Sequence, residues 1–379
     1  MRVAAYTGGV MVPSARARVR QYIEPFERLG IAVREYPLPL GNILPRQLAL
    51  RPVWMATTAA ARVAALACSW KADVTWISRQ LLPAFTPLHT MAKRPMVLDV
   101  DDAVWLNTGG HRARDLARAS EMVVCGNSFL ANQFSHWNAN VVVIPTAVNT
   151  SWYRPSRRAA DAEDGAGGAS PHPESLIMGW TGTSGNFPFL YAIEESLIRV
   201  FQIFGRAKLL IIADRPPRFK LLPESRIEFE AWTPRTELAA FDRMSIGLMP
   251  LADNDWCNGK CSYKMLCYMA AGLPVVVTAA GMNREVLAMG EVGMSASGER
   301  EWVEALTTLL QDAALRRRMG ANGRNVIEQH FSLQHLAQRY AVLLQSFGPK
   351  AQGSTSPLTL CPPKTKSQPK AQSMPEGTP

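Results

Sequence analysis

The sequence predicts an α/β protein with two doubly wound, parallel halves, and three observations support this. Short β-rich apolar runs alternate with longer helical patterns along most of the chain, which is typical of parallel sheets covered by helices. The 379 residues exceed what one hydrophobic core usually holds. Residues 156–174 contain almost no large apolar side chain, so we expect a linker or flexible insertion that divides the chain.

The first half is expected to span residues 1–155. Its apolar stretch at 48–67 is interrupted by Arg51 and Arg62, which predicts a packed amphipathic helix rather than a membrane span. Another helix is expected at 19–29. Strands are expected at 2–6, 31–36, 74–77, 96–100, 122–125 and 141–144.

The second half, residues 175–330, repeats the alternation. Thr233 is placed to cap a helix with Pro234 in its first turn, a common arrangement at helix starts. Ligands of parallel sheets bind beyond the carboxyl ends of the strands, so a cleft between the halves is expected. Strands are expected at 176–180, 208–213, 227–232, 246–250 and 274–278, and helices at 189–204, 263–271, 299–311 and 314–329.

A final helix and a tail of different composition follow. Ser332 is placed to cap an amphipathic pattern, so the last helix is expected at 331–347. Residues 348–379 are rich in Pro, Ser, Thr, Gln and Lys and have no periodicity, which predicts disorder.

The composition indicates a globular protein of a reducing compartment. Hydrophobic residues make up 47% and charged residues 19%, which excludes a disordered chain. The six cysteines show no CxxC pair and no histidine at zinc spacing, so free thiols are expected. Residues 1–6 read as a strand and not as a secretory signal. We therefore expect a cytoplasmic protein.

The chain is basic, with a formal net charge of +10, and residues 1–150 hold 16 Lys/Arg against 9 Asp/Glu. Nucleic acid is disfavoured as a partner, because no basic run is interleaved with aromatic residues. Arg16, Arg18 and Arg20 lie at the start of the first helix. They are interpreted either as a peripheral contact with the anionic inner face of a membrane or as internal groups. As internal groups they would hold an anionic acceptor in the cleft or the first helix itself. For the net charge as a whole, the alternative is a generally basic surface without a particular partner.

Two glycine turns follow strands and are candidate anion sites. Gly8 and Gly9 end the first strand, and the loop of Gly182, Thr183, Ser184, Gly185 and Asn186 lies between a strand and a helix. Backbone amides at such turns can approach a phosphate closely. Neither turn is a GxGxxG fingerprint or ends in GK[ST], so a nicotinamide cofactor and a P-loop are both unsupported. An ordinary structural turn stays open as the alternative for each.

The segment from 250 to 285 is the richest in candidate groups. Lys260 and Lys264 bracket Ser262, which is expected to cap a short helix. Lys264, one turn into that helix, could place an ammonium beside phosphates held at the helix start. A lysine on a solvated face is the alternative.

Three carboxylates gather at the end of a buried strand, at Asp99, Asp101 and Asp102. Such a cluster is costly unless its members are paired, solvated or functional. Metal binding, contact with sugar hydroxyls, proton transfer and helix capping are all open.

The motifs, in their order and spacing, resemble the retaining glycosyltransferases of family 4, which have the GT-B fold. The resemblance runs from residue 2 to about residue 344. The segments that carry it are PSARARVR (13–20), DVDDAVW (99–105), NSFLA (127–131), VIPTAVNTSWYRP (143–155), GWTGTSGN (179–186), KCSYKMLCYMAAGLPVVVTAAGMNREVL (260–287) and RMGANGRNVIEQHFSLQHLAQRYAVLL (318–344).

This resemblance implies two Rossmann-like domains that face a cleft, a donor nucleotide held mainly by the second domain, and a C-terminal crossover helix. It implies a retaining transfer from a nucleotide-sugar to a glycan or lipid-linked acceptor, without metal or cofactor, in which the leaving diphosphate is stabilised electrostatically. Its site residues would be Gly8, Gly9, the 183–186 loop and Lys264. Asp101 stands where many members carry a histidine near the transferred sugar, and Glu285 matches an acidic residue that follows a glycine turn.

The sequence also departs from the family. Two glutamates eight positions apart are common in it, and the second contacts the nucleotide ribose; here these positions are Gly259 and Cys267. The usual basic residue of the 182–186 loop is missing, which leaves Lys264 and Lys260 to meet the diphosphate. A catalytically degenerate binding protein is therefore an alternative. A sugar-nucleotide epimerase is another, although neither His111 nor His136 has an evident partner.

Overall fold

Two six-stranded sheets make up the frame of the structure, a computed structural model that describes residues 1–42, 44–45, 47–82, 87–106, 110–155 and 176–348. Every pair of neighbouring strands in both sheets is parallel. The first sheet contains β1 (Arg2–Thr7), β2 (Ala32–Pro37), β3 (Val74–Ser78), β4 (Met96–Val100), β5 (Met122–Cys125) and β6 (Val141–Val143). The second contains β7 (Ile177–Thr181), β8 (Lys208–Ala213), β9 (Ile227–Ala231), β10 (Ile246–Met249), β11 (Val275–Val277) and β12 (Gly293–Ser295). The predicted doubly wound fold class is confirmed.

The strand order of each sheet identifies where a ligand should bind. The first sheet runs β2-β1-β3-β4-β5-β6, and the second runs β12-β11-β10-β7-β8-β9. The order reverses between β1 and β3 in the first sheet and between β7 and β10 in the second. In open parallel sheets, ligands bind outside the carboxyl ends of the strands at these switch points.

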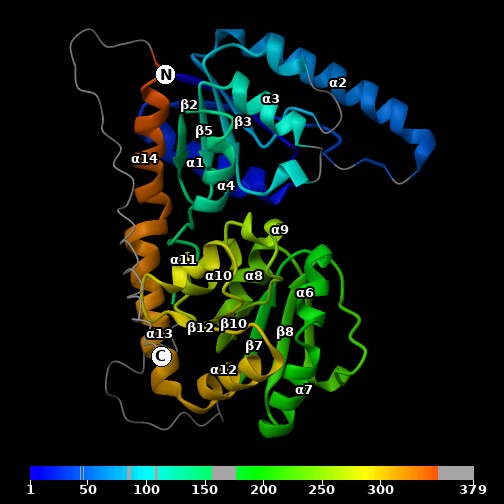
Figure 1. Ribbon diagram of the computed structural model, residues 1–379, viewed down its shortest axis with the longest axis vertical. Coiled ribbons are helices and arrows are strands. Elements are labelled where there is room, and N and C mark those ends of the chain that lie inside the picture. The colour runs from blue at the N-terminus through cyan, green and yellow to red at the C-terminus, as the bar shows by residue number, and fades with distance from the viewer. Residues whose placement is uncertain (43, 46, 83–86, 107–109, 156–175, 349–379) are drawn as a thin grey trace, which may run out of the picture. The chain divides into compact units, whose positions relative to one another are not determined.

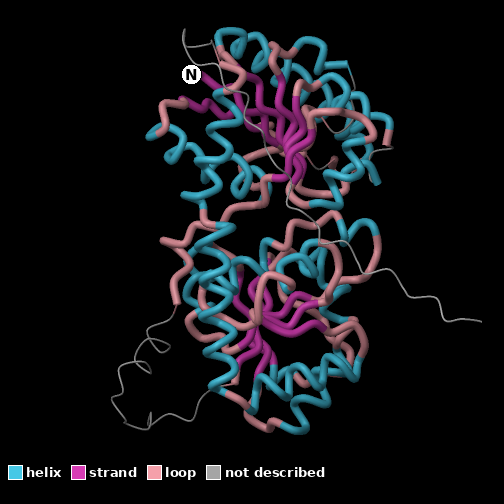
Figure 2. The backbone as a smooth tube through the Cα atoms, turned by 60° about the vertical axis from the view of Figure 1, so that its left-hand side comes forward, coloured by secondary structure: helices cyan, strands magenta, loops and turns pink. Residues whose placement is uncertain are grey.

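Helices lie on both sides of each group of strands (Figure 2). Strands β3, β4, β7, β10 and β11 are buried along their whole length, which explains why their sequences are almost uniformly apolar. The helices of the first half are α1 (Gln21–Arg28), α2 (Arg51–Cys68), α3 (His111–Ala119) and α4 (Ser128–Ser135). Those that follow are α6 (Phe187–Tyr191), α7 (Glu194–Ile203), α8 (Pro234–Phe241), α9 (Asp255–Asn258), α10 (Tyr263–Ala270), α11 (Met282–Leu287), α12 (Glu299–Gln311), α13 (Ala313–Val326) and α14 (Leu333–Gln345).

Some predicted element bounds were wrong. The helix expected at 19–29 begins earlier, as a π-helical segment at Ala15–Arg20 that continues into α1. The helix expected at 189–204 is divided into α6 and α7, because Ile193 leaves the helical conformation and is buried in the second core. The predicted linker at 156–174 and the predicted tail after residue 348 lie outside the described residues.

The last helix, α14, packs on the first half of the chain although the strands that precede it belong to the second sheet (Figure 1). The Tyr340 ring meets Tyr22, Phe26 and Trp76 edge-on, at centroid distances of 5.7, 6.0 and 5.0 Å. Just before α14, the chain pairs with Val148 through backbone hydrogen bonds of 2.8 and 2.9 Å. Aromatic burial and backbone pairing thus fix the C-terminal helix to the first half.

A buried ion pair lies beside this aromatic group. Arg18 donates from Nε and Nη2 to the two carboxylate oxygens of Asp99 at 2.9 and 2.8 Å, and from Nη1 to the Ile144 carbonyl at 2.9 Å. The Tyr340 hydroxyl donates to Asp99 at 2.7 Å. Both charged side chains have 0% exposure. Arg18 is therefore a structural residue, which corrects its assignment to an acceptor or a membrane contact.

We predict that Asp99→Asn costs about 3–5 kcal/mol of unfolding free energy, because it leaves a buried guanidinium without its counter-charge. Urea unfolding measures this cost. Glu24→Gln is the matched control, because it removes a carboxylate from the exposed Arg28–Glu24 pair and should cost about 0–1 kcal/mol. Equal costs for the two variants would show that the buried pair does not hold the fold together.

Candidate functional site

A half-buried lysine lies at the switch point of the second sheet. Lys264 is in the first turn of α10, and its Nζ lies 4.2 Å from the ring centroid of Trp180 in β7. A Cβ at Gly182 would come within 2.8 Å of Nζ, so glycine at this position leaves the amine its space. No carboxylate in the described part of the chain forms an ion pair with Lys264. Burial, helped by the nearby charge of Lys260, lowers the pKa of Lys264 to about 7.

The residues around the start of α10 differ in part from expectation. Ser262 has a left-handed backbone (φ 50°) and does not cap α10 with its side chain. Its hydroxyl donates to Asn283 Oδ1 at 2.6 Å, and Asn283 Nδ2 donates to the Thr278 carbonyl at 2.9 Å. Ser262 is thus engaged in holding α10 to α11, which corrects its interpretation as a helix cap. The Nζ of Lys260 lies 4.9 Å from the ring centroid of Trp256.

The loop predicted as an anion site is occupied by a carboxylate of the protein. The Ser184 amide donates to Asp214 Oδ1 at 2.5 Å, and the Ser184 hydroxyl donates to Oδ2 at 2.7 Å. Asn186 Nδ2 donates to Thr183 Oγ1 at 3.0 Å, while Gly185 is exposed. Burial acts against ionisation of Asp214, but its hydrogen bonds to Ser184 prevail and lower its pKa. A phosphate at Ser184 would have to displace this carboxylate.

A buried carboxylate, which sequence analysis did not identify, lies near Lys264. Glu237 in α8 is 8% exposed. It accepts from Thr181 Oγ1 at 2.8 Å and from the Tyr153 hydroxyl at 3.1 Å. Its charge acts on Lys264 and partly opposes the fall in the lysine pKa. An acidic residue in the first turn of a helix is common because its charge interacts favourably with the helix dipole. The sequence alone therefore gave no signal that distinguishes Glu237.

Both positions where the resemblance predicts a glutamate are closed. A Cβ at Gly259 would lie 2.7 Å from the Ala103 Cβ and 2.8 Å from the Ala103 nitrogen. Cys267 is 1% exposed, and its pKa is raised by burial and then by the charge of Glu237. The protein therefore has no room for the first carboxylate and places a neutral thiol where the second is expected.

The carboxylates after β4 are neutralised by arginine. Arg79 adopts a left-handed backbone (φ 65°) directly after β3, and its guanidinium lies 2.5 Å from both Asp101 Oδ1 and Asp102 Oδ2. Burial raises the pKa of Asp101, but the Arg79 charge outweighs it and the net shift is downward. The pKa of Asp102 is raised, mainly by burial. Asp99, Asp101 and Asp102 thus face guanidinium groups, and no cluster suited to a metal occurs among the described residues.

Hydrogen bonds join the ends of β4 and β5 to the loop before α10. Asn127 Nδ2 donates to the Asn258 and Lys260 carbonyls at 3.1 and 3.0 Å, and the Cys261 thiol donates to the Asp101 carbonyl at 3.2 Å. Asn127 also caps α4, since its Oδ1 accepts from the Leu130 amide. This role as a helix cap is why Asn127 did not stand out in the sequence.

Glu285 makes a further contact between the two halves. The Ser128 hydroxyl donates to the Glu285 carboxylate. Glu285 is exposed at the start of α11. The Glu285 carboxylate therefore has a protein partner in α4. Its contact with the donor stays a prediction.

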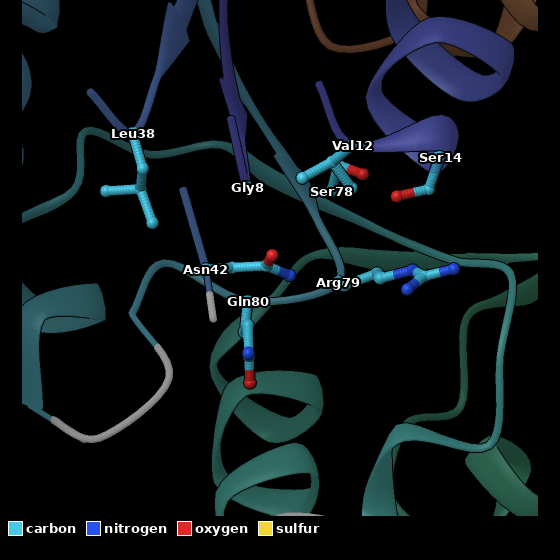
Figure 3. A pocket seen from close by; sticks show the side chains of 8 residues that line it. All are labelled: Gly8, Val12, Ser14, Leu38, Asn42, Ser78, Arg79 and Gln80. Carbon is cyan, nitrogen blue, oxygen red and sulfur yellow. The ribbon is translucent and has the colours of Figure 1, made fainter. Parts of the chain in front are cut away.

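A small hollow lies at the switch point of the first sheet (Figure 3). Ser14 and Asn42 point toward one another across it, while the Arg79 side chain extends away from Asn42. Its lining residues come from the ends of β1 and β3 and the loop after β2: Gly8, Val12, Ser14, Leu38, Asn42, Ser78, Arg79 and Gln80. Since Arg79 is paired with two aspartates, neutral polar groups dominate this hollow.

The other two N-terminal arginines have different environments. Arg20 donates to Glu35 Oε2 at 2.7 Å and to the Gly9 carbonyl at 2.9 Å, so it holds the glycine turn. Gly9 has φ 139°, and a Cβ there would lie 2.9 Å from the Gly41 Cα, which requires glycine. Arg16 is partly exposed and stacks on Trp232, with its guanidinium carbon 4.5 Å from the ring centroid.

Comparison with known proteins relates this arrangement to a family. Residues 185–312 match the family model described as glycosyl transferases group 1. No curated protein matches the chain in sequence.

Solved structures share the fold at low sequence identity. Sucrose-phosphate synthase from Thermosynechococcus elongatus is 15% identical, with a TM-score of 0.69 over 91% of this chain and 98% of the other. HepE from Anabaena, in complex with UDP-glucose, is 14% identical, with a TM-score of 0.63 over 91% and 99%. WaaG, a glycosyltransferase involved in lipopolysaccharide biosynthesis, is 15% identical, with a TM-score of 0.63 over 90% and 99%. These likenesses confirm the two-sheet architecture.

The closed position at Gly259 leads to a test of the site's packing. We predict that Gly259→Ala lowers the unfolding free energy by about 1–3 kcal/mol, because its Cβ would overlap the backbone at Ala103. Gly205→Ala is the control, since a Cβ there meets no atom within 4 Å. Chemical unfolding of both variants is the measurement. Unchanged stability in Gly259→Ala would show that residue 259 is not packed against Ala103.

Proposed function

We propose that the protein is a glycosyltransferase of the GT-B fold that takes a sugar from a nucleotide-sugar donor and transfers it with retention. The family match between residues 185 and 312 supports the donor-binding role of the second half. The acceptor is a glycan or a lipid-linked sugar. We place the reaction in the synthesis of cell-surface polysaccharide or glycoconjugate, in keeping with the named process of WaaG.

The observation that carries the proposal is the environment of Lys264. Its half-buried side chain places the amine against Trp180 at the switch point, and it has no ion-pair partner among the described carboxylates. Burying an ammonium is unfavourable, and a bound diphosphate would supply the missing counter-charge. When the bond between sugar and diphosphate breaks, negative charge develops on the leaving phosphate, and Lys264 would stabilise it there.

Glu237 would act through its neighbours. Its two oxygens hold Thr181 and Tyr153, and Thr181 directly precedes Gly182 beside the lysine amine. We infer that Glu237 positions the turn against which Lys264 lies and keeps part of the lysine population charged.

On the side of the first sheet, the hollow near Gly8 suits a neutral hydroxylated group. Asn42, Gln80 and Ser14 offer amide and hydroxyl groups, while the cation of Arg79 is already balanced by Asp101 and Asp102. We propose that sugar hydroxyls bind there. Asp101 then acts by holding the Arg79 guanidinium and does not contact the sugar itself.

A catalytically degenerate sugar-nucleotide-binding protein is the second candidate, and the closed positions at Gly259 and Cys267 favour it. The two candidates differ in one respect. Both bind the donor, but only the transferase releases nucleoside diphosphate in a manner that depends on the acceptor.

We predict that Lys264→Ala lowers kcat at least about tenfold, because it removes a charge-assisted contact to the leaving group. Release of nucleoside diphosphate, with UDP-glucose as the first donor tried, measures this. Lys208→Ala is the control, since Lys208 forms a partly exposed pair with Glu228 in the same half. Near-normal turnover in Lys264→Ala would contradict the assignment. An unmodified protein that binds donor without turnover would favour the degenerate candidate.

A further inference from the structure

The inner face of α2 buries polar groups. This helix is the packed amphipathic helix that the sequence predicts, and neither it nor any other described helix has the length and apolar content to cross a membrane. Its buried residues are spaced four apart and lie on one face: Trp54, Thr58, Arg62 and Leu66. Arg62 and Thr58 are each 1% exposed, so this face places a guanidinium and a hydroxyl inside the protein.

The Arg62 guanidinium binds three backbone carbonyls at the carboxyl edge of the first sheet. It donates from Nη2 to Thr7, the last residue of β1, at 2.9 Å, and from Nη1 to Tyr36, near the end of β2, at 2.8 Å. Its Nε donates to Leu81, in the segment that follows β3, at 3.0 Å. These strands are neighbours in the order β2-β1-β3. One side chain therefore joins the ends of three adjacent strands.

Arg62 has no carboxylate partner in the part of the chain that the structure describes. Burial lowers its pKa to about 10, and its guanidinium carbon lies 5.2 Å from the ring centroid of Tyr6. Burying a charge in this way is costly, and an apolar side chain that only filled the space would avoid the cost. The contribution of Arg62 is therefore its hydrogen bonds to the three carbonyls.

The three carbonyls belong to segments that line the hollow at the first switch point. The lining residues Gly8, Leu38 and Gln80 (Figure 3) each lie one or two positions from a residue whose carbonyl Arg62 binds. The Leu38 amide also donates to the Thr7 carbonyl at 3.2 Å. The walls of the hollow thus meet at the Arg62 guanidinium.

Trp54, two turns before Arg62 on the same face of α2, supports the loop after β2. Its Nε1 donates to the Leu40 carbonyl at 3.4 Å. Leu40 lies between Leu38 and Asn42, which both line the hollow. The inner face of α2 therefore holds this segment at two points, at the end of β2 and at Leu40.

We propose that Arg62 is a positioning residue for the acceptor: it joins three strand ends, fixes the shape of the hollow and thereby sets the affinity for a sugar. This step rests on the function proposed for the hollow. A site that is held in place before its ligand arrives loses less conformational entropy on binding. Hydrogen bonds to neutral hydroxyls also weaken steeply when their geometry is lost. Removal of the guanidinium should therefore weaken sugar binding and leave the nucleotide, held by the second half, unaffected.

Hydrogen exchange of the full chain, read by mass spectrometry, tests the positioning. Arg62→Met keeps an unbranched side chain and removes the guanidinium. We expect it to speed exchange at least about fivefold in peptides that cover residues 8–10, 36–42 and 79–82, and to leave the second half unchanged. Thr58→Val is the matched control, because the Thr58 hydroxyl is buried in the same face without a hydrogen-bond partner among the described residues. It should leave all three segments unchanged.

Sugar binding tests the acceptor role, with methyl α-glucoside as a neutral, hydroxylated probe in an NMR titration. Its affinity should fall at least about fivefold in Arg62→Met and stay unchanged in Thr58→Val. Affinity for UDP, measured by calorimetry, should be unchanged in both variants. Arg62→Lys keeps the charge but lacks the fork that reaches three carbonyls. It should show the same effects to a smaller extent, and it decides the matter where Arg62→Met does not fold.

Three results would overturn the proposal: unchanged exchange in all three segments of both Arg62 variants, unchanged glucoside binding despite faster exchange, or an equal loss of UDP binding, which would indicate general destabilisation. Absence of glucoside binding in the unmodified chain would contradict the function proposed for the hollow, and the acceptor role of Arg62 would be lost with it. Hydrogen exchange detects the positioning without a ligand, so a failure of the positioning is distinguished from a failure of the proposed function.

Discussion

The bidentate contact between Arg18 and Asp99 is the constraint on which the arrangement of the first half depends. It joins the segment after β1 to the central strand β4, and the Tyr340 hydroxyl adds α14 to the same carboxylate. The contact also fixes the backbone that carries the side chains two residues away from Arg18 and from Asp99. Arg20 is directed to Glu35 and the glycine turn, Arg16 to Trp232, and Asp101 to Arg79. One buried pair thus positions both the structural and the site residues of this region.

The two switch points differ in their charge balance, and this difference indicates which kind of ligand each one suits. At the first, Arg79 is balanced by Asp101 and Asp102, which leaves amides and hydroxyls to meet a ligand. At the second, the Lys264 amine lies against Trp180 without an ion pair in the described part of the chain. A neutral, hydroxylated molecule suits the first switch point, and a polyanion suits the second. The proposed acceptor and donor correspond to these two environments.

The sequence was sufficient for the fold and for the position of Lys264 near the start of a short helix, because both depend on local patterns. Apolar strands alternating with helices predict parallel sheets, and a lysine one turn into a short helix is visible in one dimension. The roles of Arg18, Ser184 and Glu237 were not predictable, since each depends on a partner distant in sequence: Asp99, Asp214 and Tyr153. An arginine on a helix looks alike whether it faces water or a buried aspartate. The closure of Gly259 against Ala103 likewise needs three-dimensional packing to be seen.

The central claim, that Lys264 meets the donor diphosphate, is tested most directly by proton uptake on UDP binding. The pKa of Lys264 is lowered to about 7 in the free protein, and a bound anion raises it again because it favours the charged amine. Titration calorimetry at about pH 8, in two buffers of different ionisation enthalpy, should therefore show uptake of a proton, and affinity should fall as the pH rises above 7. Lys264→Ala should abolish both effects. A binding enthalpy that does not depend on the buffer, with an affinity indifferent to pH, would contradict the account.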